Sequence, residues 1–159
     1  MDDRVTIFFK DNNLPLEAIF TGEDTSTVQK AAAVLGVEDG QIAKSLALRL
    51  PQEEAPAGVG VLVTMGTARL DNQKFKATFH TKAKMLSADE ALEATGYAVG
   101  GVCPFALPSG VKVYLDESLK RYDVVYPAAG TRDSAVKVET SRFDAYTGGT
   151  WVDVCKQPE

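Results

Sequence analysis

The chain has 159 residues, of which 45% are hydrophobic, and a formal net charge of −5. This size and composition fit one compact domain over residues 1–159 with a sizeable core. The acidic balance argues against a broad electrostatic grip on nucleic acid, because basic surfaces are typical of such binding. One stretch is nevertheless basic, and it suits either a local basic face or a solvated helix face: Lys74, Lys76, His80, Lys82 and Lys84.

No apolar run is long enough to span a bilayer, and the first residues lack the basic start of a secretory signal. We therefore expect a cytoplasmic protein with no membrane partner. Cys103 and Cys155 have no CxxC neighbour and the chain has a single histidine, so the sequence indicates no metal site and no cofactor. It also lacks the HExxH, GxSxG and P-loop motifs, which excludes the common hydrolase machinery.

Hydrophobic spacing and turn residues predict helices and strands in alternation through the first half of the chain. The expected elements are a short helix around residues 5–9, a strand over 16–20, a helix with a Ser26–Gln29 capping box that ends at Gly36, and antiparallel strands over 42–50 and 60–64.

The second half continues this alternation. It is expected to contain a helix capped by Asp71, a helix begun by the Ser87–Glu90 capping box, strands over 111–115, 123–126, 135–138 and 151–154, and a last helix capped by Thr140 and closed by Gly148. Together these elements predict a mixed α/β fold with a curved, largely antiparallel or barrel-like sheet and flanking helices.

Residues 95–108 place glycines and prolines where a helix or a central strand needs side chains and N–H donors. We expect a rigid ordered loop. Gly100 opens a GxxxP pattern that ends at Pro104, and a loop opened by glycine can aim several N–H groups into one small space, as an oxyanion hole does. A purely structural glycine loop under the sheet is the alternative.

Lys44 is unexpected on a predicted strand, because alternation puts it on the same face as Leu46 and Leu48. Either the strand lies at a sheet edge and the side chain reaches outward to solvent, or the ammonium reaches the mouth of a pocket and meets an anion.

Three segments in this order, Lys44-Ser45-Leu46, the GxxxP loop and residues 127–132, resemble the YbaK family of aminoacyl-tRNA editing domains. These are the free-standing relatives of the insertion domain of bacterial prolyl-tRNA synthetase. The resemblance runs from about Ser26 to Val154. It implies a trans-acting deacylase that hydrolyses the ester of a mischarged small amino acid, with tRNA(Pro) as the first candidate. The alternative is a catalytically silent module that binds aminoacyl-tRNA or a nucleotide.

The resemblance also implies partners and roles. The partner is the acceptor end of aminoacyl-tRNA, and a prolyl-tRNA synthetase is a further candidate. Lys44 would position the phosphate or ribose of the terminal adenosine, and the Gly100 loop would orient the ester carbonyl. The implied catalytic residues are Lys44, Gly100 and Pro104, and the implied substrate-binding residues are Ser45, Gly101, Val102, Ala128, Gly130 and Thr131.

At two positions the chain departs from the branch that acts on cysteinyl-tRNA(Pro). That branch has a serine and an aspartate where our alignment places Ala128 and Ala135. We therefore expect a pocket with smaller and less polar walls. We interpret Cys103 as a small buried residue and water as the nucleophile, because no histidine other than His80 could assist a thiol.

Overall fold

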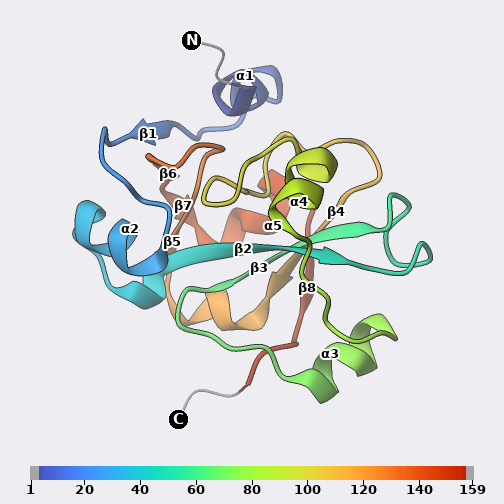
Figure 1. The fold of residues 1–159 in the computed structure, drawn as a ribbon. Coiled ribbons are helices and arrows are strands. Elements are labelled where there is room, and N and C mark those ends of the chain that lie inside the picture. Colours follow the sequence, from blue (N-terminus) through green and yellow to red (C-terminus); the bar gives the residue numbers. More distant parts are fainter. Residues whose placement is uncertain (1–3, 157–159) are drawn as a thin grey trace.

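The computed structural model describes residues 4–156. It has the expected mixed α/β fold, built on a curved sheet of six strands in the order β7-β5-β2-β3-β4-β8 (Figure 1). Two further strands, β1 and β6, pair beside it. The strands are β1 (Ala18–Phe20), β2 (Ile42–Arg49), β3 (Val59–Met65), β4 (Lys112–Asp116), β5 (Val124–Pro127), β6 (Ser134–Val136), β7 (Val138–Glu139) and β8 (Thr150–Val152).

The sheet is less antiparallel than expected. The pairs β2·β3, β5·β7 and β1·β6 are antiparallel, whereas β2·β5, β3·β4 and β4·β8 are parallel. Parallel neighbours need long crossovers, and the chain supplies one between β3 and β4 that contains α3 (Asn72–Phe79) and α4 (Ala88–Thr95). The sequence pattern predicts where the strands are, but not whether a strand that follows such a crossover runs parallel or antiparallel to its neighbour.

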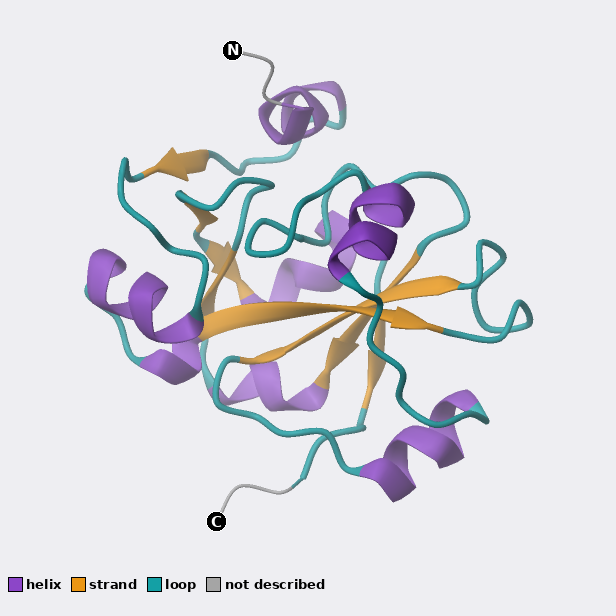
Figure 2. Ribbon diagram, in the orientation of Figure 1, coloured by secondary structure: helices purple, strands orange, loops and turns teal. Residues whose placement is uncertain are grey.

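Helices cover both faces of the sheet (Figures 1 and 2). Alternation along β3 sends Val63 to one face, where it packs with Phe9 of α1 (Arg4–Asp11) and Phe143 of α5 (Phe143–Thr147). Leu62 points to the other face and packs with Phe75 of α3. The main sheet therefore separates two cores. Among residues 4–156, no helix is long and apolar enough to cross a membrane.

Most helix ends lie where the sequence predicts them. Asp71 accepts hydrogen bonds from two N–H groups at the start of α3, and the Ser87–Glu90 capping box begins α4. Gly36 adopts the left-handed conformation after α2 (Val28–Leu35). These caps were predictable because each joins groups only a few residues apart.

Two capping predictions were wrong. The N-cap of α2 is Thr27, whose Oγ1 accepts the N–H of Lys30 at 3.2 Å, so Ser26 lies outside the helix. Thr140 begins a 3₁₀ turn that precedes α5, and its hydroxyl donates to the carbonyl of Tyr122 at 2.6 Å. Both corrections have the same cause. A segment distant in the sequence takes the hydroxyl that the local pattern assigned to the helix: the Thr140 hydroxyl bonds to the carbonyl of Tyr122, and the Ser26 hydroxyl accepts from Arg132.

The predicted strand over 135–138 is two strands. Val136 pairs with Ala18, whereas Val138 pairs with Val125 in the main sheet, so the chain changes sheets at Lys137. The strand predicted over 16–20 likewise begins only at Ala18, where its pairing with Val136 begins.

Candidate active site

One cavity of about 280 Å³ collects residues from segments that are far apart in the sequence. Its wall is formed by the start of α2, the strand β2, the 85–91 region, the loop at 99–102 and the 126–135 region. Five of the residues predicted for the site line it: Lys44, Ser45, Gly100, Val102 and Ala128. Gly101, Pro104, Gly130 and Thr131 are not part of this wall.

The cavity lies over an uncovered stretch of the edge of β2. On that edge β5 pairs only with Ile42 and Ala43, and the next contacts are Leu86 N–H to Ala47 C=O and Arg49 N–H to Lys84 C=O. Main-chain groups of a strand alternate direction with a period of two residues, so those of Ser45 face the same edge as those of Ala47 and Arg49. The cavity is thereby provided with one N–H donor and one C=O acceptor.

The side chain of Ser45 adds a further polar group. Its Oγ is buried, and it has no hydrogen-bond partner in the described part of the chain. A buried hydroxyl without a partner costs about 1–3 kcal/mol. Because Ser45 lines the cavity, a bound molecule can supply the missing partner.

Lys44 points to the opposite face of β2, as alternation predicted. Its Nζ donates to the carbonyl oxygen of Ala68 at 2.6 Å, and the side chain is half-buried. Loss of hydration lowers the pKa of this ammonium; Arg69 lowers it further, and Cys155 raises it. Lys44 is thus a residue of the cavity wall, and its ammonium is hydrogen-bonded to a neutral carbonyl instead of being paired with a carboxylate.

The glycine and proline segment is an ordered loop, as expected. It is fixed from below by Cys103 and Phe105, both fully buried, and by a 2.6 Å hydrogen bond from the hydroxyl of Tyr97 to the carbonyl of Phe105. Phe105 also packs edge-on against Phe9 of α1, with ring centroids 4.9 Å apart. Pro104 lies between these two anchors, so its contribution is to the shape of the loop.

Glycine is required at the two central positions of this loop. Gly100 has φ +95°, and a Cβ there would lie 2.9 Å from Cβ of Ser26. A Cβ on Gly101 would lie 2.8 Å from the main chain of Gly130. The two glycines therefore let the loop approach two other segments at close distance.

The loop amides divide into used and free groups. The N–H of Gly101 donates to the carbonyl of Ala98 at 2.9 Å. Within residues 4–156, no acceptor takes the N–H of Gly100 or of Val102, and both residues line the cavity. Gly100 and Val102 are therefore the amides available to a bound carbonyl oxygen.

The third predicted segment is held by one hydroxyl. Ser134 Oγ accepts the N–H groups of Ala129 and Thr131, each at 3.2 Å, and donates to the carbonyl of Thr131. Gly130 and Thr131 thus contribute to the shape of this loop and do not line the cavity. Ala128 and Ala135, where the sequence departs from the cysteine-specific branch, both line the cavity.

A family model described as the aminoacyl-tRNA editing domain matches residues 22–145. The chain belongs to this family. The resemblance found in the sequence is thereby confirmed. The Bacillus subtilis protein YwhH is 43% identical over 136 residues, which cover 85% of this chain and 84% of that protein.

Two further relatives carry functional descriptions of their own. A candidate Cys-tRNA(Pro)/Cys-tRNA(Cys) deacylase, EbsC of Enterococcus faecalis, is 28% identical, and the match covers 83% of this chain and 79% of EbsC. A crystal structure described as a candidate trans-editing enzyme for prolyl-tRNA synthetase superposes with a TM-score of 0.84 at 28% identity. That superposition covers 97% of this editing domain and 96% of the other chain.

Cys103 and His80 occupy separate environments in the editing domain. Cys103 is buried in the α1 and α5 core, where burial raises the pKa of its thiol to about 11. His80 ends α3 in a left-handed conformation, and its side chain is 74% exposed. Neither residue lines the cavity. Within the described residues, no group of three or more His, Cys, Asp and Glu side chains is arranged to hold a metal ion.

A second, larger cavity of about 890 Å³ contains none of the predicted site residues in its wall. It is open and bears charges of both signs, among them Arg69, Arg121, Asp153 and Glu117. We assign the site to the smaller cavity because it joins the segments typical of the family.

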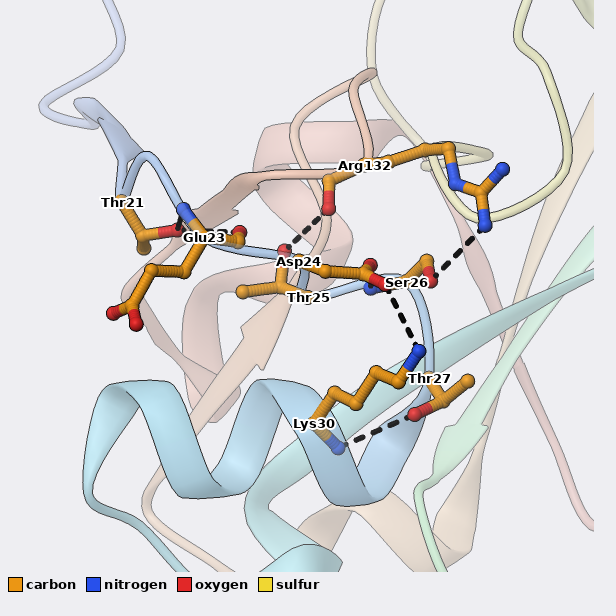
Figure 3. Close-up of polar contacts among 8 residues, drawn as sticks. All are labelled: Thr21, Glu23, Asp24, Thr25, Ser26, Thr27, Lys30 and Arg132. Atoms are coloured by element: carbon orange, nitrogen blue, oxygen red, sulfur yellow. Dashed lines mark hydrogen bonds and ion pairs between the residues drawn. The ribbon is translucent and has the colours of Figure 1, made fainter.

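Sequence reasoning missed the strap of residues 21–27, and it named Arg132 only as the last residue of the third family segment, without a role in the site. Figure 3 shows the strap running beneath the Arg132 main chain, whose carbonyl accepts the Thr25 N–H at 2.7 Å. Thr25, Ser26 and Thr27 all line the cavity. The sequence gives no sign of this, because the strap and Arg132 are more than 100 positions apart.

Proposed function

We propose that this editing domain, extending over residues 1–159, is a trans-acting deacylase that hydrolyses the ester between a wrongly attached small amino acid and the 3′ end of a tRNA. One observation carries the proposal. Lys44, Ser45, Gly100, Val102 and Ala128 come from three distant segments and line a single cavity of about 280 Å³.

The free polar groups of the cavity fit such an ester. The main-chain carbonyl of Ser45 is an acceptor suited to the α-ammonium group of the amino acid. The N–H groups of Gly100 and Val102 are donors suited to the carbonyl oxygen of the ester. Fixed amides of this kind stabilise the oxyanion that forms during acyl transfer without having to rearrange.

Water is the nucleophile in this mechanism. It adds to the ester carbonyl to give a tetrahedral oxyanion, loses its proton to solvent, and the intermediate collapses to the free amino acid and the ribose oxygen, which takes up a proton. The aminoacyl ester is already activated and the neighbouring ribose hydroxyl can orient the water, so positioning supplies much of the acceleration. Gly101 and Pro104 support this arrangement by holding the loop in its shape.

Lys44 is assigned to the terminal nucleotide. The residue belongs to the cavity wall, and its ammonium, on the other face of β2, donates to the carbonyl of Ala68, a neutral acceptor that an anionic phosphate can replace. The ammonium is attracted more strongly to an anionic phosphate oxygen than to a neutral carbonyl oxygen, so the exchange favours the bound state.

The wall composition favours a small, uncharged amino acid. Ala47, Ala128 and Ala135 offer no ionised partner, and the volume is at the low end for a ligand site. Synthetase pockets reject a slightly smaller side chain by only about 1–3 kcal/mol, which is why a second hydrolytic site is needed. We further propose tRNA(Pro) as the tRNA, a prolyl-tRNA synthetase as partner and the cytoplasm as location, in line with the relative described for that synthetase.

A panel of mischarged tRNAs tests the proposal. Purified protein is incubated with alanyl-, seryl-, cysteinyl- and prolyl-tRNA(Pro), and the remaining ester is followed over time. We expect rapid loss of one of the small mischarged amino acids and preservation of prolyl-tRNA(Pro). Tight binding of a charged tRNA with no hydrolysis of any ester would instead establish the silent binding module.

A further inference from the structure

Arg132 lies at the rim of the candidate active site. Its side chain crosses Gly100, where a Cβ would stand only 3.2 Å from Cγ and Nε of the arginine. Its Nη2 donates to Ser26 Oγ at 3.4 Å, as Figure 3 shows. Gly100 and Ser26 both belong to the cavity wall, so the Arg132 side chain contacts that wall at two residues.

The main chain of Arg132 is fixed although its side chain is exposed. Its carbonyl oxygen accepts the N–H of Thr25 at 2.7 Å. It also accepts the hydroxyl of Thr25 at 3.3 Å, the contact drawn in Figure 3. The strap therefore sets the point from which the guanidinium reaches over Gly100. Because the main chain of Arg132 is already held in place, the side chain loses less conformational entropy when it binds a ligand.

The charge of Arg132 is not balanced by a neighbouring carboxylate. The hydroxyl of Ser26, the ammonium of Lys30 at 2.9 Å and the N–H of Ser26 all interact with the Asp24 carboxyl, and they hold its pKa well below the usual range. Asp133 accepts the hydroxyl of Thr131 at 2.7 Å. Among residues 4–156, no carboxylate lies within 4.0 Å of the Arg132 guanidinium.

We propose that Arg132 binds a phosphate of the tRNA 3′ end and thereby positions the ester in the cavity. This inference rests on the proposed deacylase function and adds a substrate-binding residue to it. The guanidinium presents paired N–H donors that match phosphate oxygens, and within the described residues its one side-chain partner is the weak acceptor Ser26. Phosphates are the anions adjacent to an aminoacyl ester, so a free cation at the opening meets one when the amino acid is inside.

The test compares two esters that differ in phosphate. One is an alanyl minihelix with the acceptor stem of tRNA(Pro) and a CCA end; the other is 3′-O-alanyl adenosine, which has none. For Arg132→Gln we expect kcat/KM to fall about tenfold on the minihelix, as for loss of one charged hydrogen-bonded contact, and to stay unchanged on the adenosine ester. On the minihelix, kcat/KM of Arg132→Lys should lie between that of the wild type and that of Arg132→Gln, because lysine keeps the charge and lacks the paired N–H donors of the guanidinium.

The matched control is Arg142→Gln, which removes an exposed arginine that pairs with Glu139 and does not line the cavity. It should match the wild type on both esters. Equal losses on both esters in Arg132→Gln would overturn the proposal, because the arginine would then act through the strap. Wild-type rates on both esters in that variant would overturn it as well.

The binding of the uncharged minihelix separates this inference from the deacylase function. Its Kd should rise about tenfold in Arg132→Gln, and the slope of log Kd against log salt should fall by about one. If the wild type hydrolyses neither these esters nor any of the mischarged tRNAs of the panel, the deacylase proposal fails, and the same change in Kd still supports the phosphate contact. An unchanged Kd would exclude that contact.

Discussion

The ammonium of Lys44 donates to the carbonyl oxygen of Ala68 at 2.6 Å, on the face of β2 opposite to Ser45. Two neighbouring residues of one strand thus present a cation to one side and an unpaired hydroxyl to the other. The lowered pKa of Lys44 shows that keeping this half-buried charge costs stability. Groups retained at such a cost are candidates for function.

Lys44→Met should abolish deacylation and leave the fold intact, because it keeps the length of the side chain and removes only the desolvated charge. The free energy of unfolding should be equal to that of the wild type or higher. Since the folded-state pKa is lowered, the cost of the charge is present below that pKa and disappears as the pH rises toward 10.5. Urea denaturation of both proteins, repeated at increasing pH up to 10.5, would measure how the stability difference between wild type and Lys44→Met changes. Wild-type turnover of Lys44→Met at saturating tRNA would exclude Lys44 from the mechanism.

Gly100→Val should cripple deacylation, because a branched side chain would press on Ser26 and Arg132 and displace the loop amides. The positive φ adds backbone strain of about 1–2 kcal/mol. Gly148→Val is the matched control: it also has a positive φ, but nothing lies within 4 Å of its added Cβ. Both variants should lose stability in thermal melts, and only Gly100→Val should lose its rate. Retention of the rate would show that the loop is only scaffold.

Ser45→Ala should lower kcat/KM without lowering stability. Its Oγ is buried without a partner in the described chain, so removing it relieves a desolvation cost of about 1 kcal/mol. Ser134→Ala provides the contrast, because the Ser134 hydroxyl makes three hydrogen bonds within its loop and its loss should lower the melting temperature. A marked drop in melting temperature for Ser45→Ala would mean that its hydroxyl stabilises the free protein.

Cys103→Ala and His80→Ala should each retain most of the deacylation rate, because water is the nucleophile and main-chain amides assist it. Burial raises the pKa of the Cys103 thiol from 9.0 to about 11, so the folded state favours the neutral form. The stability advantage of wild type over Cys103→Ala should therefore be constant below pH 9 and shrink between pH 9 and 11. An aminoacyl-thioester on Cys103, detected by mass spectrometry, would replace the water mechanism with a cysteine nucleophile.

Local signals predicted much of the fold. The caps at Asp71 and Ser87 were correct because their hydrogen bonds join residues two or three positions apart. The side of β2 on which Lys44 lies followed from simple alternation. The cap at Ser26 was wrong because a distant residue competes for that side chain, and propensity cannot register such competition.

The sequence by itself determined the family, through three short segments, and the position of each segment on a strand or in a loop. Only the tertiary structure decided which of those residues share a cavity, which loop amides stay free, and that Arg132 meets Ser26 across 106 positions of sequence. The reason is physical. Caps and alternation depend on neighbours in the chain, whereas a cavity depends on strand order and on crossovers that local propensity leaves undetermined.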